Sequence, residues 1–237
     1  MGKLSSIIII AMLLHTTLLV PNLYSDINDG LVAYYPFNGN ANDESGNGNH
    51  GTVYGAVPTQ DFNGNMNSAY SFDGTNDYIQ VSDSNSLDLT TSLTFSAWIK
   101  IDSYAGDYPY LLSKEPYNYE PYRFYFQSNQ TIFGWASSAT IRRVAGVSRG
   151  VPIAEWTHVA IIFNSGNIKF YHNGESISSI NSTITSLYKT NGSLYIGTRT
   201  PANNALDGIL DEILIYNRAL SATEIQKLAD NDSCEVY

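Results

Sequence analysis

Apolar and polar residues alternate along most of this chain in short runs. The run at 93–101 is the clearest, because Phe95, Ala97, Ile99 and Ile101 fall on one side of an extended backbone. Similar runs occur at 31–37, 69–72, 77–81, 122–126, 131–136, 140–144, 155–163, 168–172, 194–198 and 206–216. Stretches rich in Gly, Asn, Asp and Pro separate these runs and are typical of turns. The pattern predicts an all-β domain of many short strands.

The run at 206–216 is apolar on both of its alternating faces. Asp211 falls among isoleucines on one face, and Glu212 falls between leucines on the other. We therefore expect a strand that is covered on both sides, with its two adjacent carboxylates pointing in opposite directions. At least one carboxylate then lies on or near a buried face. A buried carboxylate needs a partner, and a cation is the simplest one.

A short helix is predicted directly after this strand. Ser221 is a typical N-cap, and Glu224 three residues later completes a capping box. Leu220 before the cap and Ile225 after it have the spacing of a hydrophobic staple. Ile225 and Leu228 then form one apolar stripe that is expected to lie on the sheet.

The segment 38–51 is almost free of apolar residues and consists mainly of Asn, Gly, Asp, Glu and Ser. Glycine allows the backbone to curl, and Asn and Asp stabilise turns by hydrogen bonding to their own backbone. The same residues supply the carboxylate, amide and carbonyl oxygens that Ca²⁺ prefers. The spacing does not match the twelve-residue EF-hand loop.

Four segments together resemble the laminin-G-like, concanavalin A-like lectin and glucanase family, in a bacterial-type secreted form. They are the loop Asp43-x-Ser-Gly-Asn with its following glycine, Trp-Thr-His-Val-Ala at 156–160, Asn-Gly at 173–174, and Asp-Glu to the capped helix at 211–224. The resemblance covers nearly all of the chain after residue 30. It implies an all-β fold, a two-sheet antiparallel jelly-roll sandwich with a short C-terminal helix.

The resemblance also implies a structural Ca²⁺ between the early loop and the late strand. Asp43, Asn47 and Asp211 are the expected ligands, with Asn49 as a further candidate. The alternative is a solvated loop of turns, with Asp211 merely hydrogen-bonded. A second point concerns Leu214, where the family often has a basic residue. That apolar position predicts an additional contact on this face, made by the chain itself or by a partner.

Residues 1–25 read as a secretory signal peptide, with Lys3, a short apolar core and the small Ser25 at the expected cleavage point. The apolar core is short and interrupted, so no membrane span is expected after cleavage; a retained anchor is the alternative. Residues 26–230 then form one domain, and residues 231–237 are a tail or the start of a linker. The single Cys234 makes no internal disulfide and is free to pair with another molecule. We expect a secreted, extracellular or cell-surface location.

The chain is strongly acidic, with a net charge of −10. Without residues 1–25 it keeps 11 basic and 22 acidic residues, a net charge of −11. Such a charge disfavours nucleic acid and anionic lipid as partners, and it suits hard cations.

Candidate ligand-binding residues lie in the aromatic parts of the chain. Tyr117 and Tyr119 belong to a segment rich in Tyr and Pro, and a tyrosine ring suits sugar faces and protein surfaces alike. The alternative is a loop held by its own aromatic residues. Trp98 falls on the polar side of its strand and is a further sugar-binding candidate, although packing beneath a loop is the favoured interpretation. Arg142 and Arg143 are adjacent, so they are expected on opposite faces and not as a clamp.

The sequence favours a binding protein over an enzyme. Glucanases of this fold place carboxylates on alternate residues of one strand, and the adjacent Asp211 and Glu212 do not fit that spacing. His158 has no evident Ser or Cys partner. We therefore predict a secreted non-catalytic module that binds carbohydrate and holds a structural calcium ion. The alternatives are a protein-binding or adhesion module of a cell-surface protein, and a glycoside hydrolase with an unrecognised site.

Overall fold

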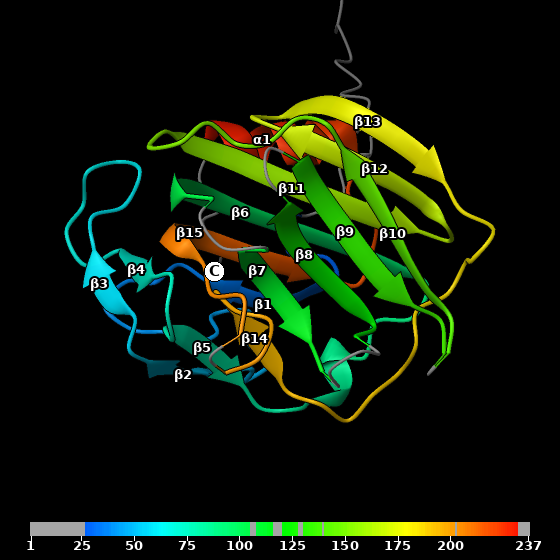
Figure 1. Ribbon diagram of the computed structural model, residues 1–237, viewed down its shortest axis with the longest axis horizontal. Helices are drawn as coiled ribbons and strands as arrows, with labels where there is room; N and C mark the ends of the chain where they lie inside the picture. The colour runs from blue at the N-terminus through cyan, green and yellow to red at the C-terminus, as the bar shows by residue number, and fades with distance from the viewer. Residues whose placement is uncertain are drawn as a thin grey trace, which may run out of the picture.

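The computed structural model describes residues 27–104, 108–115, 120–127, 130–138, 140–201 and 203–231. Within this part of the chain, two antiparallel sheets lie face to face and one short helix packs behind one of them (Figure 1). The predicted jelly-roll sandwich with a short C-terminal helix is confirmed. The predicted signal peptide and the tail with Cys234 lie outside the described residues.

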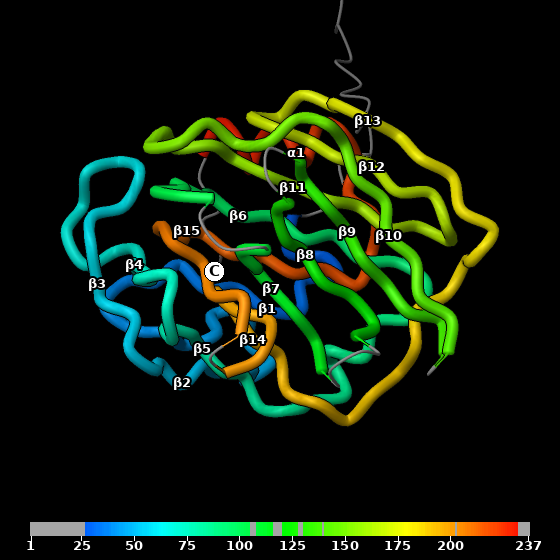
Figure 2. Tube along the Cα trace, viewed as in Figure 1, coloured from blue at the N-terminus to red at the C-terminus, as the bar shows by residue number. Residues whose placement is uncertain are grey.

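The larger sheet, called sheet A, has eight strands in the described residues. Seven follow the order β13 (Glu175–Asn181), β12 (Asn167–His172), β11 (Trp156–Asn164), β6 (Ser92–Ser103), β15 (Asp207–Tyr216), β4 (Ala69–Asp73) and β3 (Val57–Thr59). The eighth, β1 (Leu31–Tyr35), pairs with β15. In Figure 2 the first strand of the chain thus lies beside the last.

The smaller sheet, called sheet B, has seven strands in the described residues. Their order is β10 (Arg142–Val147), β9 (Gln130–Ala136), β8 (Tyr122–Gln127), β7 (Tyr110–Lys114), β14 (Leu194–Ile196), β5 (Tyr78–Val81) and β2 (Gly51–Tyr54). A 3-10 turn at Asn85–Leu87 connects β5 to β6. In Figure 1 the strands β7 to β10 cross in front of sheet A, so their outer face looks toward the viewer.

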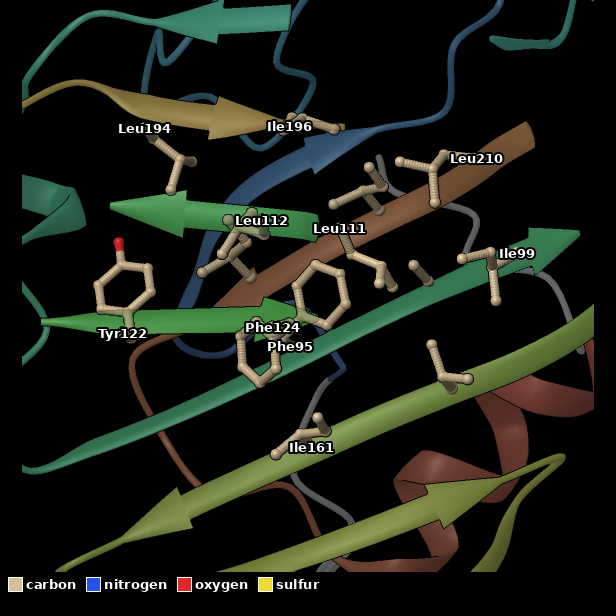
Figure 3. Packing of buried hydrophobic residues seen from close by; sticks show 14 of the residues in the cluster. Phe95, Ile99, Leu111, Leu112, Tyr122, Phe124, Ile161, Leu194, Ile196 and Leu210 are labelled. Atoms are coloured by element: carbon tan, nitrogen blue, oxygen red, sulfur yellow. The ribbon is translucent and has the colours of Figure 1, made fainter. Parts of the chain in front are cut away.

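The main core fills the space between the two sheets. Alternation along β6 sends Phe95 and Ile99 into this space, and alternation along β8 sends Phe124 to meet them (Figure 3). The rings of Phe95 and Phe124 stack with centroids 4.6 Å apart and join the sheets directly. Each large side chain buried in this way stabilises the fold by roughly 1.5–3 kcal/mol.

A second apolar cluster lies on the outer face of sheet A, beneath the helix α1 (Ala222–Asp230). Ser221 caps the helix and forms the predicted capping box with Glu224. Ile225 and Leu228 pack on Leu214 of β15, which confirms that β15 is covered on both faces. The additional contact predicted at Leu214 therefore comes from the chain's own helix. Within the described residues, no helix has the length and apolar character that crossing a membrane requires.

Candidate functional site

The loop after β1 is held by Asp43, which is buried. Its Oδ1 accepts backbone hydrogen bonds from Tyr34 and Ser45, each at 2.9 Å. Its Oδ2 accepts the backbone N–H of Asn49 at 2.8 Å. Three main-chain donors thus converge on one carboxylate, which fixes the loop against β1.

The side chains of Asn47 and Asn49, in the same loop, also form hydrogen bonds to β1. The Asn49 side-chain amide donates to the Val32 carbonyl at 2.8 Å, and that of Asn47 donates to the Leu31 carbonyl at 3.0 Å. Because β1 pairs only with β15 among the described strands, its other edge has backbone groups that need partners. The loop side chains supply them and take the place of a neighbouring strand.

The two acidic residues of β15 lie on the same face, which corrects the sequence prediction. Asp211 pairs with Trp98 and Leu214 pairs with Ser96, so two residues of β15 oppose one residue of β6. This β-bulge contains Glu212, whose φ of 47° is left-handed. A bulge interrupts the two-residue period, so both carboxylates point to the outer face of sheet A.

Asp211 is 1% exposed, and the pKa of its carboxyl group is raised. Burial raises its pKa to about 8, and the neighbouring charge of Glu212 adds to the rise. Its Oδ1 accepts the backbone N–H of Glu212 at 2.8 Å, and within the described residues Asp211 forms no ion pair. Burial also raises the pKa of Glu212, an effect that the hydroxyl of Tyr34 partly offsets.

Tyr34 connects the early loop to the late strand. Its backbone N–H donates to Asp43, and its hydroxyl donates to Glu212 Oε2 at 2.7 Å. The early loop and the late strand are thus joined by a tyrosine and by the pairing of β1 with β15.

The four expected calcium ligands all take part in hydrogen bonds within the protein. Asp43, Asn47 and Asn49 use their side chains on the edge of β1, whereas Asp211 belongs to the bulge on the outer face of sheet A. In the described residues, no group of three or more His, Cys, Asp and Glu side chains is placed to hold a metal. The calcium site stays a prediction of the family resemblance.

A thermal melt tests the calcium site. We expect the same melting temperature in millimolar calcium and in a chelator, because the backbone N–H groups of Tyr34, Ser45 and Asn49 already bond to the Asp43 oxygens. A melting temperature several degrees higher with calcium, lost in an Asp43→Asn variant, would instead support the ion that the resemblance implies.

The raised pKa of Asp211 predicts that stability falls as the pH rises from about 4 to about 8, because the folded chain keeps a proton that the unfolded chain releases. Asp211→Asn removes this charge, so it should flatten the dependence. Between pH 6.5 and 8 the wild type should lose about 2 kcal/mol relative to this variant. Urea unfolding at a series of pH values measures the difference, with the exposed Glu175→Gln as control. Parallel curves for wild type and Asp211→Asn would contradict the prediction.

Trp98 packs beneath the loop that follows β3, as the favoured interpretation expected. The ring of Phe62 stacks on it with centroids 4.3 Å apart and an interplanar angle of 7°. This contact covers one face of the indole, and the ring of His158 meets the indole edge-on with centroids 5.6 Å apart. The proposed sugar-binding role of Trp98 stays a prediction, and it requires that Phe62 move away.

His158 does have a serine partner, contrary to the sequence prediction. Its Nε2 lies 2.7 Å from Ser96 Oγ, on the neighbouring strand. Both side chains are buried, and burial lowers the pKa of His158 to about 3, so the ring is neutral at physiological pH. The cavity beside them and Glu212 measures about 10 Å³, which holds about one water molecule. A sugar or an acyl substrate does not fit there.

A group of arginines occupies the outer face of sheet B. Arg123 of β8 lies flat across Gly134 of β9, where a Cβ atom would come within 2.5 Å of its Nε. Its Nη1 donates to Glu120 Oε2 at 3.0 Å, and Arg199 Nε donates to Glu120 Oε1 at 2.7 Å. Glu120 is 1% exposed, so this buried carboxylate fixes two guanidinium groups in place.

Beside Arg123 lies a pocket of about 330 Å³, which we call the arginine pocket. Among the described residues, Arg123, Arg142, Arg143 and Val144 line it. Arg142 and Arg143 were predicted to lie on opposite faces of their strand, and this stays a prediction. Both residues border the pocket from β10, an edge strand in the described sheet, and Nη1 of Arg143 donates to the Arg142 carbonyl at 2.8 Å.

Tyrosines surround this part of sheet B. Tyr110 and Tyr125 stack with centroids 4.8 Å apart, and Tyr108 meets Tyr125 edge-on at 5.9 Å. Arg123 and Tyr125 share a face of β8, since the intervening Phe124 lies in the core. The candidates Tyr117 and Tyr119 lie outside the described residues and stay predictions.

Sequence reasoning missed Glu120, Arg199 and Gly134 as parts of this site. A signal was available only for Arg123, through the alternation of β8. The others come from separate segments, and nothing local in the sequence brings them together.

Comparisons with known proteins agree with this architecture. The chain aligns with the binding domain of botulinum neurotoxin DC, solved in complex with rat synaptotagmin II, at a TM-score of 0.70 and 16% identity, covering 87% of this chain and 52% of that chain. A structure concerning cell entry of botulinum neurotoxin type C through two ganglioside molecules aligns at 0.71 and 17%, covering 87% and 52%. The binding domain of Paraclostridial Mosquitocidal Protein 1 aligns at 0.70 and 18%, covering 87% and 53%.

This chain spans about half the length of those solved chains, and identities this low establish the fold alone. No curated protein sequence matches the chain significantly. A family model described as the concanavalin A-like lectin/glucanases superfamily, laminin G type, matches residues 73–226, more than half of the sequence. The chain therefore belongs to the concanavalin A-like lectin and glucanase superfamily, as the resemblance predicted.

Proposed function

We propose that this chain is a non-catalytic carbohydrate-binding module that works outside the cell, with its ligand on the outer face of sheet B around Arg123. The observation that carries the proposal is the arginine pocket of about 330 Å³ beside a stacked group of tyrosines. Pockets of this size accommodate small ligands, and aromatic rings next to fixed polar groups suit the faces and hydroxyls of sugars.

A hydrolytic role has less support. A glycosidase needs two carboxyl groups that flank the bond to be cleaved, with space for the sugar between them. Asp211 and Glu212 share a face, but the cavity beside Glu212 holds about one water molecule. Two of the similar solved structures named above, those of botulinum neurotoxin DC and of Paraclostridial Mosquitocidal Protein 1, are binding domains, which accords with the proposal. The extracellular location rests on the predicted signal peptide.

A glycan array tests the proposal. The wild-type domain should bind a defined set of glycans, and Tyr108→Ala should weaken that binding, because Tyr108 lies exposed beside the stacked tyrosines. Tyr188→Ala is the control, since Tyr188 is similarly exposed and is not among the stacked tyrosines around Tyr125. The double variant Tyr117→Ala, Tyr119→Ala tests the two sequence candidates. Equal binding by all variants would remove these residues from the site, and an empty array would reject carbohydrate binding.

Protein binding is the second candidate, and the edge strand β10 favours it. Val144 is 57% exposed there and Ile141 just before the strand is 43% exposed. An exposed edge with apolar side chains suits a partner that adds a strand. A partner recovered by this domain and not displaced by free sugars would support this alternative.

A further inference from the structure

Within the described residues, more cationic than anionic side chains gather around the arginine pocket. Four of the six arginines of the chain, Arg123, Arg142, Arg143 and Arg199, gather at or beside it, although the chain as a whole carries a net charge of −10. Glu120 is the acidic partner of Arg123 and Arg199. Within the described residues, neither Arg142 nor Arg143 forms an ion pair.

Arg123 is the buried member of the arginine pocket. It is 9% exposed, and its Nε is buried without a hydrogen-bond partner among the described residues. A buried donor without an acceptor destabilises the folded state, and more so when the group is charged. Gly134 beneath it leaves the space in which the guanidinium lies flat. Glu120 holds it from one side, so its orientation is fixed before any ligand arrives.

Like charges around one hollow repel each other, and an anion in the hollow removes that repulsion. Guanidinium groups match the geometry of carboxylate and sulfate oxygens, with paired N–H donors in one plane. Val144 supplies an apolar wall to the same pocket, which suits the ring of a sugar rather than a free ion.

We propose that the arginine pocket binds the acidic group of a glycan, so that the ligand of this module is an anionic carbohydrate bearing carboxylate or sulfate. This inference rests on the proposed carbohydrate-binding function and narrows its ligand class. Arg142 and Arg143 contact the anion from the open edge of β10, and Arg123 contacts it from the floor. The site discriminates against neutral sugars because they leave its cations unpaired.

The test compares matched glycans and matched variants. Isothermal titration is carried out with one oligosaccharide in neutral, sulfated and carboxylated forms. The variant Arg142→Gln, Arg143→Gln removes two exposed cations from the pocket. The control Arg149→Gln, Lys169→Gln removes two exposed cations elsewhere, so both variants change the net charge equally. Melting curves confirm that both remain folded.

We expect an acidic form to bind the wild type at least about tenfold more tightly than the neutral form. The pocket variant should lose that preference, and the control variant should keep it. Comparing the affinities of the sulfated and carboxylated oligosaccharides shows which acidic group the pocket prefers. Equal binding of neutral and acidic forms, or equal losses in both variants, would overturn this inference and leave carbohydrate binding intact. No binding of any form by the wild type would overturn the proposed function itself.

Discussion

Asp43→Ala is expected to lower the free energy of unfolding by about 3–5 kcal/mol, one of the two largest effects that we predict. The substitution leaves the backbone N–H groups of Tyr34, Ser45 and Asn49 without their acceptor. Hydrogen bonds to a charged acceptor contribute more than neutral ones, and the Tyr34 and Asn49 bonds lie in a buried region. In the Asp43→Ala variant, the loop should also detach from the edge of β1 that does not pair with β15.

Urea unfolding measures this loss, and hydrogen exchange at the Tyr34 amide locates it. The control is Asn47→Ala, because Asn47 is exposed and its hydrogen bonds lie at the surface. We expect that control to cost less than about 1 kcal/mol. If Asp43→Ala cost no more than Asn47→Ala, Asp43 would not hold the loop as the structure indicates.

Glu120→Gln should produce the second large loss, about 3–5 kcal/mol. Glu120 is 1% exposed and accepts from both Arg123 and Arg199, so the change leaves two partly buried guanidinium groups without their anion. The glutamine keeps the shape of the side chain, so the effect reports charge rather than packing. Exposed Glu155→Gln serves as the control.

The Glu120 substitution also predicts a second observable. Arg123 depends on Glu120 for its position on the floor of the arginine pocket. Acidic glycans should therefore bind Glu120→Gln more weakly at a temperature where the variant is still folded. A stability equal to that of wild type would show that the ion pairs contribute nothing to the fold.

Much of the fold could be predicted from the sequence because its causes are local. Alternation along β6 and β8 sends Phe95 and Phe124 to the core, and the capping box begins α1 at the predicted residue. Leu214 was recognised as needing cover, and the helix provides it. These features depend on residues that are close in the sequence.

The positions of the acidic residues on β15 could not be predicted in the same way. A β-bulge at Glu212 changes the alternation, and no turn residue such as glycine marks it in the sequence. The calcium prediction met a related difficulty at Asp43. The oxygen atoms of such a loop can bind a cation, or they can accept hydrogen bonds from backbone N–H groups that lack a partner. The sequence does not show which backbone N–H groups lie near Asp43, and in the structure those of Tyr34 and Asn49 do.

The arginine pocket illustrates a third difficulty, because it depends on contacts between distant segments. Arg123, Arg142 and Arg199 come from β8, from β10 and from the segment after β14. Their approach requires the complete order of sheet B. When the strand order of sheet B is unknown, Arg142 and Arg143 are interpreted as ordinary surface charges.

The most direct test of the binding surface is an NMR titration of the labelled domain with the glycan that binds most tightly on the array. The account predicts that amide shifts change in β8, β9 and β10 and at the Arg123 side chain. It also predicts that signals around Trp98 and α1, on the outer face of sheet A, stay unchanged. Shift changes gathered around Trp98, with β8 to β10 silent, would contradict the claim that this module binds its ligand on sheet B.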